Sequence, residues 1–225
     1  MEFLSIGGIT ALTTIDYPGC LSTVIFLQGC RWKCRYCHNP HLQAILPNES
    51  LPLEDIFNLL EMRKGFVEAV VFSGGEPLRQ KALPEVVKKV KEMGFKVGLH
   101  TAGSEPDFFV KVLPLLDWVG FDIKYSFENY AEITGLSGSG EQARESLEHL
   151  IRASIDFEIR ITMDEVLKIP VIVHALKEIA DMGVKTVVLQ KCRSKGDNVF
   201  EHPLFSDKLA LDEVSGYFDN FSIRE

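Results

Sequence analysis

The alternation of two kinds of hydrophobic segment constrains the fold of this chain more than any other feature. Short runs rich in β-branched residues predict strands, and the longer amphipathic runs between them predict helices. The predicted strands cover residues 22–29, 68–75, 95–103, 117–124, 156–163 and 184–190, and the predicted helices cover 53–66, 83–94, 107–116, 141–153 and 170–183. Such alternation indicates an α/β fold with a mainly parallel sheet. Complete eight-stranded barrels need about 250 residues, so about six βα units in 225 residues indicate an incomplete barrel or an open sheet.

Polar and glycine-rich segments stand at the carboxyl ends of these predicted strands. A cysteine loop follows the first strand, "SGGEP" the second and "HTAG" the third, "DIK" closes the fourth, Arg160 lies in the fifth, and "QKCR" follows the sixth. Ligands of parallel sheets and barrels bind at the carboxyl ends of the strands. We therefore expect these segments to meet at one site.

Three of the five cysteines lie in "CRWKCRYCHNP", residues 30–40. Cys34 to His38 formally match a haem-attachment motif, His38 could complete a zinc site, and Cys34 with Cys37 could form a redox dithiol. Three buried cysteines without a function would be the plainest alternative. Haem and dithiol both leave Cys30 unexplained, and adjacent Cys37 and His38 rarely reach one metal. A [4Fe–4S] cluster would use all three thiolates and leave one iron open to a ligand.

The motifs resemble those of radical S-adenosylmethionine (SAM) enzymes. The spacing C-x₃-C-x₂-C with Tyr36 before the last cysteine is similar to their cluster motif, and "VVFSGGEPL" is similar to their second motif. "TTIDYPGCLSTVIFLQGCRWKCRYCHNP", "DIKY" with the "TG" after it, and "IRITM" resemble more narrowly the activating proteins of anaerobic ribonucleoside-triphosphate reductases and the pyruvate formate-lyase-activating enzymes. The fold that we expect is therefore an α/β incomplete TIM-like barrel.

The resemblance implies a role for each polar segment. Cys30, Cys34 and Cys37 would bind the cluster. The residues expected to bind SAM are Tyr36, Gly74, Gly75, Glu76, Thr101, Asp122, Lys124, Arg160 and Gln190. We expect Glu76 to face the ligand or to order its loop. Two alternatives stay open, because Glu76 could instead be a surface carboxylate and Asp122 could form a buried ion pair with Lys124.

Three further residues carry separate expectations. His100 stands where pyruvate formate-lyase activators usually have an aspartate that helps to bind a monovalent cation beside SAM. A neutral imidazole is a poor ligand for such a hard cation, which argues against this cation site, although Thr101 remains. We expect Cys20 to be a small buried residue. Cys192 is either buried or faces the mouth of the barrel together with Gln190.

The reaction implied by the resemblance is the reductive cleavage of SAM to a 5′-deoxyadenosyl radical. That radical would remove a hydrogen atom from a glycine Cα of a partner enzyme similar to anaerobic ribonucleotide reductase. A flavodoxin- or ferredoxin-type protein would supply the electron. Two alternatives are a radical SAM enzyme that acts on a small molecule, similar to 7-carboxy-7-deazaguanine synthase, and a metal-binding protein that is not an enzyme.

Charge and hydrophobicity bound the remaining possibilities. A net charge of −8 without a block of Lys and Arg argues against nucleic acid as a partner. The N-terminus lacks the pattern of a signal peptide, and no apolar run approaches the roughly 18 residues of a membrane span. We expect a cytoplasmic protein with a single domain over residues 1–225, a cluster loop at 28–40 and a C-terminal tail at about 195–225.

Overall fold

The computed structural model describes residues 4–44, 50–193 and 199–224. These residues form a nine-stranded sheet in the order β1-β2-β3-β4-β5-β6-β7-β8, and β9 also pairs with β7. The strands are β1 (Ile6–Thr13), β2 (Ser22–Leu27), β3 (Ala69–Gly74), β4 (Lys96–Thr101), β5 (Trp118–Ile123), β6 (Asp156–Met163), β7 (Thr186–Arg193), β8 (Val199–Phe200) and β9 (Asn220–Arg224). The α-helices are α1 (Leu53–Arg63), α2 (Leu83–Glu92), α3 (Pro106–Val112), α4 (Tyr130–Thr134), α5 (Ser139–Arg152), α6 (Ile169–Asp181) and α7 (Lys208–Ser215).

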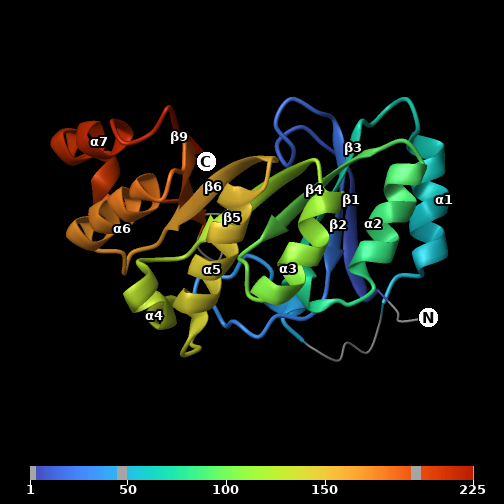
Figure 1. The fold of residues 1–225 in the computed structure, drawn as a ribbon, viewed down its shortest axis with the longest axis horizontal. Helices are drawn as coiled ribbons and strands as arrows, with labels where there is room; N and C mark the ends of the chain where they lie inside the picture. The colour runs from blue at the N-terminus through green and yellow to red at the C-terminus, as the bar shows by residue number, and fades with distance from the viewer. Residues whose placement is uncertain (1–3, 45–49, 194–198, 225) are drawn as a thin grey trace.

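Strands β2 to β7 pair in parallel, each with the next in the chain, and β9 extends the parallel ladder beyond β7. Helices α1, α2, α3, α5 and α6 lie on the same side of the sheet as one another (Figure 1). This arrangement confirms the predicted α/β fold of about six βα units. All six predicted strands and all five predicted helices are present, with shifts at their ends.

The two ends of the chain add elements that the sequence analysis did not predict. Strand β1 pairs with β2 in antiparallel orientation and occupies an edge of the sheet. Residues 199–224, which fall in the predicted tail, contain β8, α7 and β9. The first residues of that tail, 195–198, lie outside the described residues. The described helices include none that is both long and apolar enough to span a bilayer.

The two faces of the sheet bury different kinds of side chain. Val119, Phe121 and Ile123 of β5 face the helices and belong to the large hydrophobic core. Trp118, which alternates with them, belongs to a small second core on the opposite face. This core also contains Tyr17 from the β1–β2 connection and apolar residues of β2 and β3. Cys20 is part of this second core and is buried, as predicted. The second core fills the amino-terminal half of that face and leaves its carboxyl-terminal half to polar groups.

An ion pair on the polar face of the sheet joins β9 to β6. The guanidinium of Arg224 donates to both carboxylate oxygens of Glu158 on β6, at N···O distances of 3.0 and 3.2 Å. The side chain of Glu158 is only 6% exposed and that of Arg224 is 33% exposed. Glu158 therefore depends on Arg224 to compensate for its lost hydration.

We predict that Arg224→Leu destabilises the protein by roughly 3 kcal/mol, because removing one partner leaves a buried carboxylate uncompensated. The free energy of unfolding in urea measures this loss. Arg152→Leu, which breaks an exposed pair with Glu148 on α5, is the matched control and should cost less than about 1 kcal/mol. Equal losses in the two variants would contradict the structural role of the Glu158–Arg224 pair.

Candidate functional site

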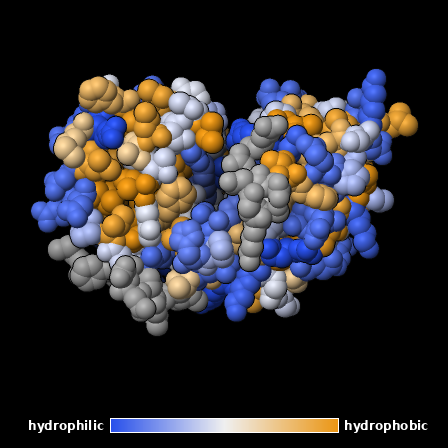
Figure 2. Space-filling view, turned by 180° about the vertical axis from the view of Figure 1, so that it is seen from behind, coloured by the Kyte–Doolittle hydropathy of each residue, from blue (hydrophilic) through white to orange (hydrophobic). Residues whose placement is uncertain are grey.

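A cavity of about 280 Å³ opens at the carboxyl ends of the parallel strands. This size is close to the lower end of the range for small-molecule sites. Seen from the side opposite to the helices, the molecule is hollowed between its two halves (Figure 2). Side chains from the cysteine loop and from strands β3 to β7 line the cavity.

Every residue that the sequence analysis assigned to the cluster or to SAM lines this cavity. They are Cys30, Cys34, Tyr36, Cys37, Gly74, Gly75, Glu76, Thr101, Asp122, Lys124, Arg160 and Gln190. The lining also includes residues to which no such role was assigned, namely Asp16, Phe26, Trp32, His38, Asn39, Gln43, Ser73, His100, Ala102 and Thr162. The convergence predicted from the strand ends is thus present in the structure.

The cysteine loop is fixed to the sheet by backbone hydrogen bonds. The amide of Gly29 donates to Leu42 O at 2.7 Å, and that of Glu76 donates to Gly29 O at 3.0 Å. On the far side of the loop, the amide of Lys33 donates to Thr134 O of α4 at 2.8 Å. The loop is therefore anchored to the segment that follows β3 and to α4, and these anchors restrict the positions of its thiols.

Gly74 and Gly75 allow the backbone after β3 to lie close to the backbone of the cysteine loop and of β2. Gly74 has φ of +113°, and a Cβ there would lie 2.3 Å from Leu27 O. A Cβ on Gly75 would lie 2.7 Å from Gly29 O and 2.9 Å from Leu42 O. A valine at Gly74 would therefore push the ends of β2 and β3 apart, so this substitution would disturb the fold in addition to any effect on a ligand.

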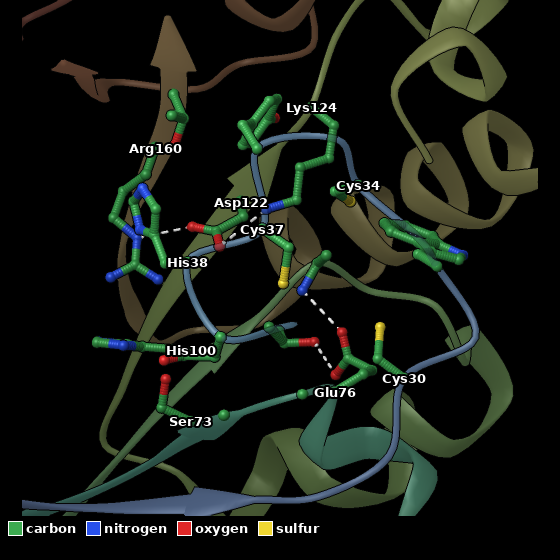
Figure 3. Close-up of a pocket in the computed structure, with 18 of the residues that line it drawn as sticks. Cys30, Cys34, Cys37, His38, Ser73, Glu76, His100, Asp122, Lys124 and Arg160 are labelled. Atoms are coloured by element: carbon green, nitrogen blue, oxygen red, sulfur yellow. Dashed lines mark hydrogen bonds and ion pairs between the residues drawn. The ribbon is translucent and has the colours of Figure 1, made fainter. Parts of the chain in front are cut away.

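The three thiols lie half-buried along the loop at one side of the cavity (Figure 3). Burial and then the Glu76 carboxylate raise the pKa of Cys30 to about 12. Burial likewise raises the pKa of Cys34. Both groups are therefore neutral thiols in the metal-free chain, and a cationic metal centre is what would stabilise their thiolates.

The spacing of the donors distinguishes between kinds of metal centre. In the residues that the structure describes, no three His, Cys, Asp or Glu side chains converge closely enough to hold one metal ion. A structural zinc ion needs such convergence, whereas each iron of a [4Fe–4S] cluster takes a thiolate of its own. Trp32 Nε1 and Tyr36 Oη are buried without a hydrogen-bond partner, and both residues line the cavity. A polar group bound there would end their isolation, so this site fits a cluster and a ligand.

Glu76 orders its own loop. Its Oε1 accepts hydrogen bonds from the Thr101 hydroxyl at 2.6 Å and from the Leu78 amide at 3.1 Å, and its Oε2 accepts one from the Ala102 amide at 2.9 Å. Burial nevertheless raises the pKa of this carboxyl, although the three hydrogen bonds oppose the shift. Glu76 thus joins the end of β3 to the end of β4, which agrees with the expected loop-ordering role. The alternative of a surface carboxylate is wrong, because Glu76 is only 1% exposed.

Asp122 lies between two cations on the polar face of the sheet (Figure 3). Its Oδ1 accepts from Arg160 Nε at 2.9 Å and its Oδ2 accepts from Lys124 Nζ at 3.2 Å. Burial alone would raise the pKa of Asp122, but Arg160 and Lys124 together hold it well below its usual range. The pKa of Lys124 is raised because the attraction of Asp122 exceeds the effect of burial. The three side chains are therefore all charged and carry a net charge of +1.

Gly120 makes room for this charged group. It faces Arg160 from the neighbouring strand, and a Cβ on Gly120 would lie 2.7 Å from Arg160 Cζ and 2.9 Å from the Trp118 ring. The guanidinium also donates to Gly120 O at 3.2 Å. The missing side chain thus lets Arg160 lie flat on the sheet beside Asp122.

His100 is a buried neutral imidazole at the end of β4. Its Nε2 lies 2.8 Å from Asp16 O, so Nε2 carries the proton and donates it to this carbonyl. Burial first, and the nearby Arg160 second, lower the pKa of His100 to about 3. The imidazole therefore stays uncharged at neutral pH and holds residue 16 against the sheet.

Cys192 lies apart from the cavity that Gln190 lines. It is buried, and its Sγ is 4.0 Å from Asp164 Oδ2. Asp164 in turn pairs with Arg35 of the cysteine loop at 3.4 Å. Cys192 therefore packs beside the Asp164–Arg35 pair of the cysteine loop, while Gln190 faces the cavity.

The lining residues that the sequence analysis did not assign lie at positions that are harder to predict from the sequence. Asp16 comes from the connection between the antiparallel strands β1 and β2, where no rule places a ligand. Ser73 and Thr162 alternate with core residues on β3 and β6, and a single hydroxyl carries little signal in a sequence. The alternation itself, read from Glu158 and Arg160 on β6, could have identified Thr162.

Comparisons with known proteins agree with this geometry. A sequence profile described as the radical SAM superfamily matches residues 24–182. A protein of Methanocaldococcus jannaschii, named provisionally as a glycyl-radical enzyme activating enzyme, is 39% identical over 150 residues, which cover 65% of this chain and 61% of that protein. The pyruvate formate-lyase-activating enzyme of Clostridium pasteurianum is 34% identical over 141 residues, covering 60% of this chain and 59% of the enzyme. The chain thus spans about three fifths of the length of these relatives.

Solved structures with the same fold are more distant in sequence. QueE from Escherichia coli has a TM-score of 0.59 and 18% identity, covering 98% of this chain and 93% of QueE. SuiB from Streptococcus suis, bound to S-adenosylmethionine, has a TM-score of 0.65 and 13% identity, covering 91% of this chain and 46% of SuiB. These similarities confirm the predicted incomplete barrel and say nothing about the substrate.

We predict that the apoprotein loses stability as the pH is lowered below about 6.5, because of His100. The pKa of His100 is about 3 in the folded chain and about 6.5 in the unfolded one, so between these values the unfolded chain binds more protons. Its contribution to stability is complete above about pH 6.5 and is lost at up to about 1.4 kcal/mol per pH unit on acidification.

The free energy of unfolding in urea at pH 7.0, 6.0 and 5.0 measures this slope. His100→Gln, whose amide can still donate to Asp16 O, should make the dependence shallower, and the exposed His174→Gln is the matched control. An unchanged slope in His100→Gln would show that other groups cause the acid sensitivity.

Proposed function

The chain belongs to the radical SAM superfamily, and on that premise we propose that it activates a glycyl radical enzyme. Members of this superfamily use a [4Fe–4S] cluster and SAM, and these are the cofactors of this radical SAM enzyme. When bound, the reduced cluster supplies one electron that divides SAM into methionine and a 5′-deoxyadenosyl radical. One observation carries the assignment of the site to this chemistry: the three loop thiols and the Asp122 group line the same cavity.

Cys30, Cys34 and Cys37 would hold the cluster, and three thiolates would leave one iron available to a ligand. Trp32 is almost completely buried and Tyr36 presents a ring to Lys124, whose Nζ lies 5.9 Å from the ring centroid. These two aromatic side chains would keep water from the cluster, because they surround the thiols with apolar surface.

The group of Asp122, Lys124 and Arg160 suits the amino acid part of SAM. A carboxylate has about four acceptor positions, and Asp122 uses one on each oxygen, so it can also accept from an ammonium group. Lys124 and Arg160 both have donors beyond those that bind Asp122, and these can reach a carboxylate. Asp122 can thus bind the ammonium group of SAM, while Lys124 and Arg160 can bind its carboxylate.

The remaining lining residues would contact the rest of the ligand or the substrate. Thr162 and Gln190 are register neighbours on β6 and β7, and both line the cavity. Ser73 lies near His100 at the other end (Figure 3). These uncharged polar groups can hydrogen-bond a ribose or a peptide backbone without adding charge beside a radical.

We propose further that the hydrogen donor is a glycine Cα in a partner enzyme similar to anaerobic ribonucleotide reductase, and that a flavodoxin- or ferredoxin-type protein is the reductant. The relatives that are named as activating enzymes support this substrate class. The cavity opens between two halves of the molecule (Figure 2), which leaves room for a loop of a second protein.

We predict that Gly120→Ala weakens SAM binding roughly tenfold to a hundredfold, the equivalent of one charge-assisted hydrogen bond. The added methyl group would displace the flexible Arg160 guanidinium from Asp122 and would press on the buried Trp118 ring. Urea unfolding of the variant separates lost stability from lost affinity. Anaerobic equilibrium dialysis with the cluster-loaded protein measures the affinity. Gly8→Ala, where a Cβ has no neighbour within 4 Å, is the control, and equal affinities in both variants would remove Arg160 from the site.

We predict that Cys37→Ala abolishes SAM cleavage and lowers the bound iron, whereas Cys20→Ala does neither, because Cys37 lines the cavity and Cys20 does not. The experiment is anaerobic reconstitution with dithionite and SAM, with and without a candidate glycyl radical enzyme. Methionine and 5′-deoxyadenosine are quantified, and the glycyl radical is read by electron paramagnetic resonance. Formation of 5′-deoxyadenosine by Cys37→Ala would refute the cluster assignment. Turnover of a free small molecule without a partner would favour the alternative radical SAM reaction.

A further inference from the structure

The charges of the cysteine loop differ in sign from those of the protein as a whole. The chain has 32 acidic residues and a net charge of −8, yet no acidic residue lies between Asp16 and Glu49. The only Lys and Arg residues in that stretch are Arg31, Lys33 and Arg35, and all three lie in the cysteine loop. A basic segment thus coincides with the segment that would hold the cluster.

Arg31 and Lys33 lie on the outer surface of the loop. Both are exposed, whereas Trp32 between them is buried and lines the cavity. Neither side chain forms an ion pair with an acid in the described residues. Arg35 differs, because it pairs with Asp164 at 3.4 Å and with Glu165 at 2.7 Å. Arg31 and Lys33 therefore keep their full charge available at the surface.

The loop holds these two cations in defined places. The Lys33 amide is bonded to Thr134 O at 2.8 Å. The Trp32 ring packs edge-on against Tyr130, with ring centroids 5.6 Å apart. Arg31 is adjacent in sequence to Cys30, and Lys33 is adjacent to Cys34. A protein that contacts these two side chains is therefore only one residue away from two of the cluster ligands.

We propose that Arg31 and Lys33 form the docking surface for an acidic one-electron carrier protein. This inference rests on the proposed function, because only a cluster that cleaves SAM needs an electron for each turnover. The other cysteines, Cys20 and Cys192, are buried in separate segments, so they do not supply a second cluster. The electron passes from the carrier, which is oxidised by one electron, to the cluster, which is reduced by one, and no bond or proton is exchanged.

The two sides of the loop separate the reactants. Its inner side, with Cys30, Cys34 and Tyr36, faces the cavity that SAM and the substrate would occupy. Its outer side, with Arg31 and Lys33, is exposed. A carrier bound on the outer side would not block the cavity, so reduction could proceed with SAM already in place.

Charge complementarity favours an acidic partner at this surface. Over most of its surface, a protein with a net charge of −8 repels an acidic carrier. Local cations beside the redox centre would orient the encounter and raise its rate, by about tenfold to a thousandfold in steered associations. Such steering weakens as salt shortens the reach of the charges.

The test compares electron delivery by a protein and by a small molecule. Arg31→Glu/Lys33→Glu is the main variant. Arg31→Gln/Lys33→Gln is a milder variant, which still tests the proposal if the first does not fold. Lys88→Glu/Lys111→Glu, on the exposed sides of α2 and α3, is the control with the same change in net charge. Reduction of the loaded cluster by a reduced acidic flavodoxin is followed anaerobically by stopped flow at rising ionic strength.

We expect the Arg31→Glu/Lys33→Glu rate with flavodoxin to fall at least about tenfold at low salt, with a smaller fall in the Gln variant and a flatter salt dependence in both. Iron content and the end-point of SAM cleavage with excess dithionite should match the unmodified protein. A flavodoxin rate equal to that of the unmodified protein, or an equal fall in the Lys88/Lys111 control, would overturn the proposal.

The two proposals can fail separately. Absence of SAM cleavage by the unmodified protein with dithionite would refute the proposed function, whatever the variants do. If the Arg31/Lys33 variants cleave SAM normally with dithionite but yield less glycyl radical on the partner enzyme, the surface binds that enzyme and the carrier proposal is wrong.

Discussion

A close backbone contact at the ends of β2 and β3 sets the positions of the groups in the cavity. Gly74 and Gly75 bring β3 against Leu27, Gly29 and Leu42, and no residue with a Cβ fits at either glycine without displacing this backbone. The cysteine loop begins at that contact, so its direction is set by main-chain hydrogen bonds. These hydrogen bonds restrict the positions of the thiols, which would reduce the ordering cost of assembling a cluster.

The polar face of the sheet shows how the fold accommodates buried charges by pairing them. Asp122 is paired with Arg160 and Lys124, and Glu158 is paired with Arg224. Buried pairs of this kind roughly balance attraction against lost hydration, so the large hydrophobic core under the helices must supply most of the stability. Because the hydrophobic core supplies most of the stability, the carboxyl-terminal half of the opposite face can be given to ligand chemistry.

Sequence reasoning predicted the parallel sheet and the assembled site better than it predicted the edges. The inner strands are near-continuous apolar runs, and the rule that ligands meet the carboxyl ends of parallel strands brought Asp122, Arg160 and Gln190 to one cavity. Strand β1 has two glycines and mixed exposure, and β9 is five residues long, so neither has a clear period. The role of Gly74 in packing against Leu27 could not be predicted either, because it depends on distances between segments that are separate in the sequence.

The loop shows how one short segment can serve two surfaces with opposite requirements. The thiols and Trp32 face inward, where apolar surroundings disfavour charge and exclude water, and the burial that raises the pKa of Cys30 is a measure of that environment. Arg31 and Lys33 face outward, where water hydrates their charges. Trp32 between them is buried, so the loop turns adjacent side chains to opposite sides. Trp32, packed edge-on against Tyr130, thus separates the apolar surroundings of the thiols from the two exposed cations beside it.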